Sequence, residues 1–211
     1  MKRLFITTMV IAAIAFTACN SGNTSHEAHE HDSTTAAAGE TAKAEAVGDN
    51  TPPTAVQPQF SNIDPKVAAS LKTVVARYLQ IKNGLAADNS GEAASNGKAM
   101  AEAMQQLDKS ALTPEQQKVY TENEEDLKEH AEHIGKNEGN IDHQREHFAQ
   151  MSEDVYALVK AYGGGQPLYH DFCPMYDNNK GALWLSETKE VKNPYFGNKM
   201  PDCGVVKEEI K

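Results

Sequence analysis

Positive charge is scarce in this sequence. Its 20 lysine and arginine residues are outnumbered by 30 aspartate and glutamate residues, and the formal net charge is −10. Proteins that bind nucleic acid need a basic surface against the phosphate groups, so we expect no nucleic-acid partner. The acidic balance suits a protein that meets cations, although charge alone bears on solubility more than on the choice of partner.

Long apolar runs are also missing. The most apolar stretch lies within "MKRLFITTMVIAAIAFTAC", where residues 4–16 follow two basic residues. It is shorter than the roughly 20 residues that a membrane-spanning helix needs. The stretch leads through small residues into Cys19, which resembles the site where bacterial lipoproteins are cleaved and lipidated.

We therefore predict that residues 1–18 are a lipoprotein signal peptide and that a lipid on Cys19 anchors the chain to a membrane, on the periplasmic side of the cell envelope. An ordinary cleaved signal beside a chance cysteine is the alternative. Cleavage would remove two basic residues and change the formal charge from −10 to −12. Only Cys173 and Cys203 would then stay unmodified, and two cysteines in an oxidising compartment form either a disulfide or a metal site.

Catalytic motifs are absent as well. No Ser/His/Asp arrangement, phosphate-binding loop or paired-carboxylate motif stands out in the sequence. The acidic neighbours Asp171 and Asp177 do not favour a nucleophilic thiolate at Cys173, because reactive thiols need an electropositive environment. We therefore predict a binding protein rather than an enzyme.

Large apolar side chains are nearly absent from residues 19–62. The segment consists mainly of Ser, Thr, Ala, Gly, Glu and Pro, which cannot bury enough surface to fold, so we predict a disordered tether. Its "HEAHEH" stretch contains His26, His29 and His31. These imidazoles could hold Zn, Cu or Ni ions loosely, or they could be solvated linker residues.

Helical periodicity begins after the tether. Apolar residues recur at spacings of three and four behind four start signals, and three glycines from Gly163 onward end the last helix. Four helices of similar length with short connections predict a mainly α fold, an antiparallel up-and-down four-helix bundle over residues 63–164. The expected capping residues are Asp64, Asn89 or Ser90, Thr113 and Asn140.

Four histidines are expected to gather at one end of this bundle. His130 and His133 lie in the last two turns of the third helix. His143 and His147 are four residues apart at the start of the fourth helix and therefore share a face. Such a pair facing further histidines has the spacing of a metal site. Each histidine alone could be a capping or solvated residue, and His130 is the one most readily assigned to packing.

Residues 165–211 show neither helical nor long strand periodicity. We predict an irregular segment with short strands and turns packed on the bundle, including a strand at "ALWL" and a turn at "NNKG". The segment carries two sulfur pairs, Cys173 with Met175 and Met200 with Cys203. Thiolate, thioether and imidazole together select Cu(I) or Ag(I), whereas zinc sites use cysteine and histidine without thioether.

The chain is long enough to bring these sulfur atoms to the histidines. Ten extended residues can span roughly 33 Å, and the helix between them and His147 rises about 23 Å. Reach permits one shared site but does not require it, so a separate Cys/Met site remains open.

Several stretches together resemble a known family, namely "AEHIGKNEGNIDHQREHFAQMSEDVYALVKAYG", "DFCPM" and "NPYFGNKM". The family is a domain of unknown function that occurs in bacterial envelope lipoproteins and is appended to periplasmic adaptor subunits of copper and silver efflux pumps. The resemblance covers Asp64 to Ile210 and implies a periplasmic metal-handling role. It singles out seven positions, with His130 matching less well: His133, His143, His147, Cys173, Met175, Met200 and Cys203.

The leading expectation is a lipid-anchored envelope protein that binds a soft metal ion. Cu(I) is the expected ion, with Ag(I) or zinc as the other candidates, for sequestration or for transfer to an efflux-pump adaptor. The alternative is a structural or interaction module of an envelope complex, in which a disulfide between Cys173 and Cys203 fixes the C-terminal segment.

Overall fold

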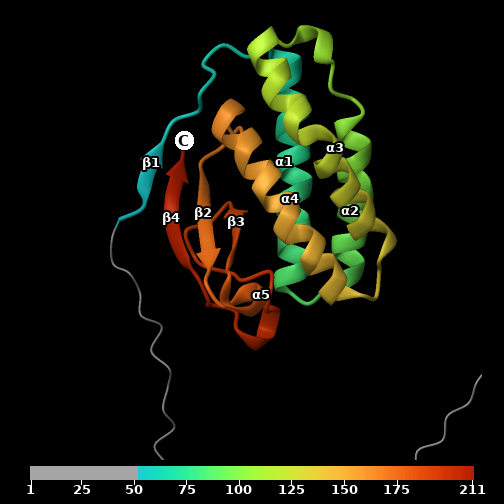
Figure 1. Cartoon of the computed structure of the whole chain (residues 1–211), viewed down its shortest axis with the longest axis vertical. Helices are drawn as coiled ribbons and strands as arrows, with labels where there is room; N and C mark the ends of the chain where they lie inside the picture. Colours follow the sequence, from blue (N-terminus) through green and yellow to red (C-terminus); the bar gives the residue numbers. More distant parts are fainter. Residues whose placement is uncertain (1–51) are drawn as a thin grey trace, which may run out of the picture. The chain divides into compact units, whose positions relative to one another are not determined.

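The structure is a computed structural model that describes residues 52–211 (Figure 1). The predicted signal peptide, the lipidation site at Cys19 and the histidines of "HEAHEH" lie outside the described residues. The described part of the chain is mainly helical, with short strands in its C-terminal region, as the sequence predicts.

Four long helices make up most of the fold, and their starts agree with the predicted capping signals. The third helix begins with a capping box, in which Gln116 N–H donates to Thr113 Oγ1 at 3.3 Å and Thr113 N–H donates to Gln116 Oε1 at 3.1 Å. The fourth helix ends at Gly163, whose φ of 81° favours glycine. The helices are α1 (Pro65–Ala86), α2 (Ser90–Met104), α3 (Pro114–Lys136) and α4 (Ile141–Tyr162), capped by Asp64, Asn89, Thr113 and Asn140.

Successive helices pack against each other, and α4 also contacts α1. Helices α2 and α3 approach closely at Gly97, where a Cβ atom would lie 2.7 Å from the carbonyl oxygen of Ala131 and 2.8 Å from the amide nitrogen of Gly135. Between α1 and α4, the buried rings of Tyr78 and Phe148 stack with centroids 5.1 Å apart. The close approach at Gly97 places the last turns of α3 directly against α2.

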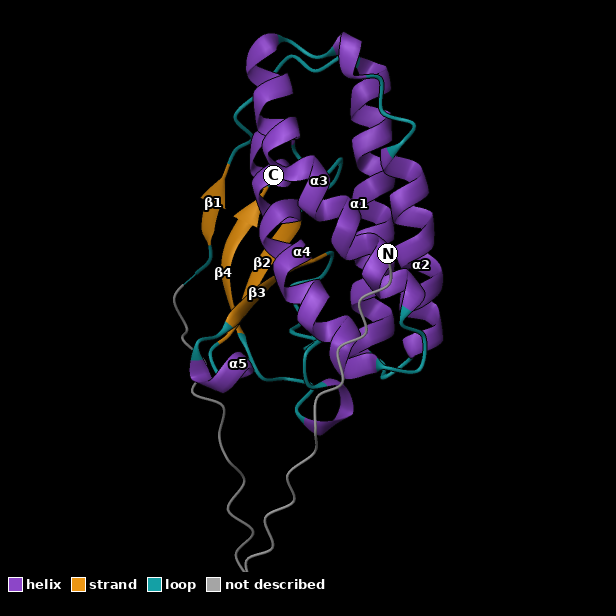
Figure 2. Ribbon diagram, turned by 45° about the vertical axis from the view of Figure 1, so that its right-hand side comes forward, coloured by secondary structure: helices purple, strands orange, loops and turns teal. Residues whose placement is uncertain are grey.

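A four-stranded sheet lies along one side of the helices, where β3 contacts both α4 and α1 (Figure 1; Figure 2). The strand order is β1-β4-β2-β3, with β1 parallel to β4 and the other pairs antiparallel. The predicted strand at "ALWL" is confirmed as part of β3, but the sequence analysis missed β2 and β4. The strands are β1 (Thr54–Val56), β2 (Leu168–Cys173), β3 (Ala182–Ser186) and β4 (Val205–Ile210).

The predicted boundary of the tether is wrong at its C-terminal end. Thr54–Val56 belong to the predicted tether but form β1, which pairs with the last strand, and Lys211 N–H donates to Val56 O at 3.0 Å. Further along, Phe60 packs on Tyr162 with ring centroids 5.3 Å apart. The composition of this segment indicated disorder because the segment has few apolar residues of its own. It is ordered by partners that lie far along the chain, which composition does not reveal.

The predicted turn at "NNKG" is present as a left-handed turn. It overlaps the short element α5 (Tyr176–Asn179), in which Asp177 and Asn178 have φ values of 45° and 56°. Asn and Asp tolerate this region better than other side chains do. Two short 3₁₀ helices complete the described part, η1 (Lys109–Ala111) and η2 (Gly197–Lys199). No helix within residues 52–211 has the length and apolar character needed to cross a membrane.

Candidate metal centre

The four histidines lie where α3 ends and α4 begins. A buried side chain, Gln144, ties this end of the fold together, because its Nε2 donates to Ile134 O in α3 at 3.0 Å and to Ser90 O at the start of α2 at 3.1 Å. His143 and His147 are one helical turn apart on α4. The fixed start of α4 therefore also fixes where both imidazole rings meet α3.

Three of these histidines form a group with the geometry of a metal site. His133, His143 and His147 each offer one ring nitrogen, and these nitrogens all lie within 4.8 Å of one another. The Nε2 atoms of His143 and His147 are 3.2 Å apart. Two nitrogens that bind one ion tetrahedrally at about 2.0–2.1 Å are separated by about 3.3 Å. This pair is therefore already spaced for a common ion, and a ring nitrogen of His133 lies within 4.8 Å of both.

His130 is in direct contact with this group. Its Nδ1 lies 3.1 Å from Nδ1 of His147, and the two ring centroids are 5.3 Å apart. From the sequence, His130 is the histidine most readily assigned to packing, because it lies nearest the apolar stripe of α3. The structure shows that it also has a polar partner, so packing alone does not describe its role.

The environment keeps the central histidine neutral. Burial, with smaller contributions from charge repulsion by the neighbouring His133, His143 and His130, lowers the pKa of His147 to about 4. Burial also lowers the pKa of His130. Because a metal ion binds the unprotonated nitrogen of imidazole, these shifts keep the lone pairs available at neutral and mildly acidic pH.

Carboxylates flank the two outer histidines of the group. Glu146 Oε2 lies 3.3 Å from Nδ1 of His143, and Glu129 Oε1 lies 3.8 Å from Nε2 of His133. Histidine ligands commonly donate their other N–H to such a group, which holds the ring in place. Neither carboxylate was predicted from the sequence. Their spacings of three and four residues from the histidines do place them on the same helix face as the histidines, so this signal was present.

The two cysteines form a separate pair at the end of β2. Cys173 is buried, Cys203 is partly buried, and their Sγ atoms are 3.0 Å apart. Burial, together with the smaller effect of the neighbouring Cys173, raises the pKa of Cys203 to about 12. Two sulfur atoms bound to one ion at about 2.3 Å would lie about 3.7 Å or more apart. The Cys203 thiol therefore keeps its proton at neutral pH, and the two sulfur atoms are closer than shared ligation requires.

The predicted ligands therefore fall into two groups. Within residues 52–211, one group of at least three histidine, cysteine or carboxylate side chains is close enough to share a metal ion. That group is His133, His143 and His147, and it contains neither cysteine. Met175 is 49% exposed, and Met200 is partly buried three residues before Cys203. Chain length permitted one shared site, but the structure brings together the histidines in one place and the cysteines in another.

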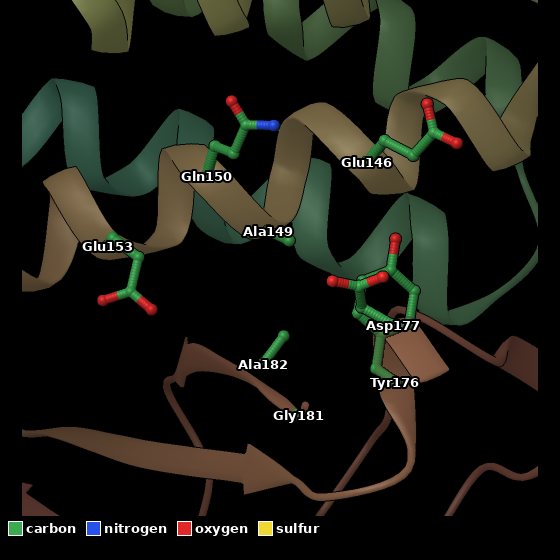
Figure 3. Close-up of a pocket in the computed structure, with 8 residues that line it drawn as sticks. All are labelled: Glu146, Ala149, Gln150, Glu153, Tyr176, Asp177, Gly181 and Ala182. Atoms are coloured by element: carbon green, nitrogen blue, oxygen red, sulfur yellow. The ribbon is translucent and has the colours of Figure 1, made fainter. Parts of the chain in front are cut away.

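An open pocket of about 580 Å³ lies between α4 and the segment that contains α5 (Figure 3). Glu146 and Glu153 line it from α4, and Tyr176 and Asp177 line it from the opposite side. Glu146 thus belongs both to the pocket wall and to the surroundings of His143. The carboxylates give this pocket a negative potential, which favours cations.

His170, which belongs to "YHDFCPM", is not part of the histidine group. It lies on β2, where its ring packs against Tyr156 with centroids 4.5 Å apart and its Nδ1 is 3.6 Å from Glu208 Oε2. Burial lowers the pKa of this histidine. It serves as an internal control for the experiments below, because it is a partly buried histidine outside the group.

A family model matches residues 74–166. It is described as a protein of unknown function, DUF3347. The match contains all four clustered histidines and none of the sulfur residues of the C-terminal segment. No curated protein and no solved structure matches the chain. The match supports the resemblance to a domain of unknown function, while its setting in lipoproteins and efflux adaptors stays a prediction.

Proposed function

We propose that this chain is a metal-binding protein and that His133, His143 and His147 hold the ion. The observation that carries the proposal is the grouping of their ring nitrogens within 4.8 Å, with one pair at 3.2 Å. The low pKa of His147 and the flanking carboxylates support it. The role is capture of an ion, for storage or for transfer to an efflux system, rather than catalysis.

Copper is the proposed ion. Imidazole suits copper, zinc and nickel, and copper binds most strongly among the divalent ions of the first transition row. The sequence predicts Cu(I) because of the sulfur residues, whereas the separation of the cysteines from the histidines favours an imidazole site that either copper oxidation state could occupy. Zinc is the competitor at such a site, and Ag(I) is the competitor for Cu(I).

Metal titration tests this assignment. The mature chain should bind about one copper ion tightly in a background in which the N-terminal His26, His29 and His31 are replaced by Ala. A His147→Ala substitution should weaken copper binding by more than about 100-fold. Losing a residue that only supports a ligand already weakens metal affinity 10–100-fold, and losing a ligand should cost more. Cu(I), Cu(II) and Zn(II) should each be titrated against a competing chelator of known affinity.

Two controls give this test its meaning. A His170→Ala variant should bind copper as tightly as the parent chain does, since His170 lies outside the histidine group. A double Cys173→Ser, Cys203→Ser variant should also keep its affinity. If the double cysteine variant lost the ion while His147→Ala kept it, the histidine assignment would be wrong and a sulfur site would replace it.

The setting of the protein is also part of the proposal. We infer a lipoprotein of the cell envelope, anchored through Cys19, in which the four long helices form an antiparallel up-and-down bundle. The short connections and the contacts between successive helices support the bundle.

Mass spectrometry tests the lipid anchor. The mass of the mature chain should correspond to cleavage before Cys19 plus covalent lipid, and a Cys19→Ser variant should lack the lipid mass. A mature chain without lipid would contradict the anchor.

A second candidate function has an observation of its own. The 3.0 Å separation of the Cys173 and Cys203 sulfurs favours a disulfide that fixes the C-terminal segment, as expected for a structural or interaction module. This role is compatible with metal binding at the histidines, because the two groups are separate. Its test is developed in the Discussion.

A further inference from the structure

We propose that His130 is a positioning residue that holds His147 in the tautomer able to bind the ion. This inference rests on the proposed function. His130 lies outside the three proposed ligands and acts on the ion only through the ring of His147. The proposed contact is a hydrogen bond from Nδ1–H of His147 to Nδ1 of His130.

The observation behind it is a continuous chain of short polar contacts. His130 Nδ1 is 3.1 Å from His147 Nδ1, and the other nitrogen of that ring, His147 Nε2, is 3.2 Å from His143 Nε2. His143 Nδ1 is in turn 3.3 Å from Glu146 Oε2. Both nitrogens of His147 are therefore engaged, so the proton position on this ring is set by its neighbours.

The carboxylate at the end fixes the direction of the chain before an ion binds. An ionised carboxylate can only accept, so His143 donates from Nδ1 and its Nε2 is an acceptor. His147 must then donate from Nε2, and its Nδ1 accepts from Nδ1–H of His130. Each neutral ring carries one N–H in this arrangement, and every contact has one donor and one acceptor.

Ion binding through both Nε2 atoms requires the opposite tautomer of His147. His143 already presents a lone pair at Nε2, but His147 must move its proton from Nε2 to Nδ1. The Nδ1–H of His147 then needs an acceptor, which His130 supplies when its own proton moves to Nε2. The three rings carry three N–H groups before and three after, so this chain releases no net proton when the ion binds.

Substitutions at position 130 test the role. A His130→Asn variant keeps a polar acceptor close to the place of Nδ1, whereas His130→Phe keeps the ring volume and removes the acceptor. We expect His130→Phe to weaken copper binding 10–100-fold, the range for loss of an outer-shell partner, and His130→Asn to remain within about threefold of the parent chain. His170→Phe is the matched control at a histidine outside the group and should leave the affinity unchanged.

A direct readout of the tautomer separates positioning from a merely structural role. Nitrogen–proton correlation NMR of the ¹⁵N-histidine-labelled mature chain, recorded with and without a diamagnetic ion such as Zn(II), should show the proton of His147 moving from Nε2 to Nδ1. In His130→Phe this shift should be incomplete while the fold, judged by circular dichroism, is retained.

The outcomes are distinguishable. If the parent chain binds no ion, the proposed function fails, and the positioning role fails with it. If the parent binds copper and His130→Phe binds it equally well, the metal site stands and the inference about His130 is overturned. An ion-bound His147 that keeps its proton on Nε2 would overturn it too, because the ion would then occupy Nδ1.

Discussion

An Asp171→Asn variant should be more stable than the parent chain at pH 8, and the difference should grow as the pH rises from 5. Asp171 lies on β2 opposite Trp184 and is fully buried, and among residues 52–211 neither of its carboxyl oxygens has a hydrogen-bond partner. Its pKa is raised to about 8, mainly by burial, with Lys82 opposing the shift and Glu187 adding a smaller part of it. Asn has nearly the shape of the protonated acid and carries no charge at any of these pH values.

The sign follows from proton linkage. An aspartate in the unfolded chain ionises near pH 3.8, whereas Asp171 in the native chain keeps its proton up to about pH 8. Between these values the native state binds one more proton than the unfolded state. This group alone therefore lowers the free energy of unfolding by about 1.4 kcal/mol per pH unit as the pH rises. The Asn variant lacks this slope, so the gap between the two proteins should reach several kcal/mol.

Urea unfolding of both proteins between pH 5 and pH 8 measures the effect, because groups common to both cancel in the difference. Asp177→Asn is a useful control, because the contribution of Asp177 should not change between pH 5 and pH 8. That exposed carboxyl has its pKa lowered by a hydrogen bond from Lys180, so its contribution to stability is present above the unfolded pKa and lost in acid. Parallel curves for Asp171→Asn and the parent chain would show that Asp171 is ionised in the native state.

The helices could be predicted from the sequence because their signals are local. Asp64 followed by a proline, and Thr113 with Gln116, specify helix starts through atoms that are at most a few residues apart. The histidine group was also within reach. His143 and His147 share a helix face, and the short connection between the third and fourth helices brings His133 to the same end.

The sheet could not be predicted in the same way because its pairings are not local. Thr54 in β1 lies opposite Glu208 in β4, and the strand at Thr54–Val56 is too short to show an alternating pattern. The separation of the cysteines from the histidines was also beyond the sequence, since chain length sets only the largest distance a segment can span. The burial of Asp171 depends on packing that no neighbouring residue reveals.

The second large effect on stability is expected when Cys173 and Cys203 are oxidised to a disulfide. Mild oxidation by an external disulfide such as oxidised glutathione should convert the two thiols into one disulfide. The two electrons and two protons that the thiols lose break the glutathione disulfide and give two molecules of reduced glutathione. The Sγ atoms are already 3.0 Å apart, and the residues are 30 apart in the chain. Closing a loop of this size stabilises a fold by about 3–4 kcal/mol through the reduced entropy of the unfolded chain.

Chemical unfolding of the oxidised and reduced chain should show this difference, with thiol counting to confirm the state of each sample. A Cys173→Ser, Cys203→Ser variant should respond to neither oxidant nor reductant. Two free thiols after prolonged treatment with the oxidant would contradict the pairing.

The same two samples also separate the sulfur site from the histidine site. A disulfide offers no thiolate, so oxidation would abolish copper binding through Cys173 and Cys203. Binding through His133, His143 and His147 should persist, because no cysteine belongs to that group within residues 52–211. If copper affinity survives oxidation and stability increases, the cysteines stabilise the fold and the histidines bind the ion. If oxidation abolishes copper binding, Cys173 and Cys203 are the ligands instead.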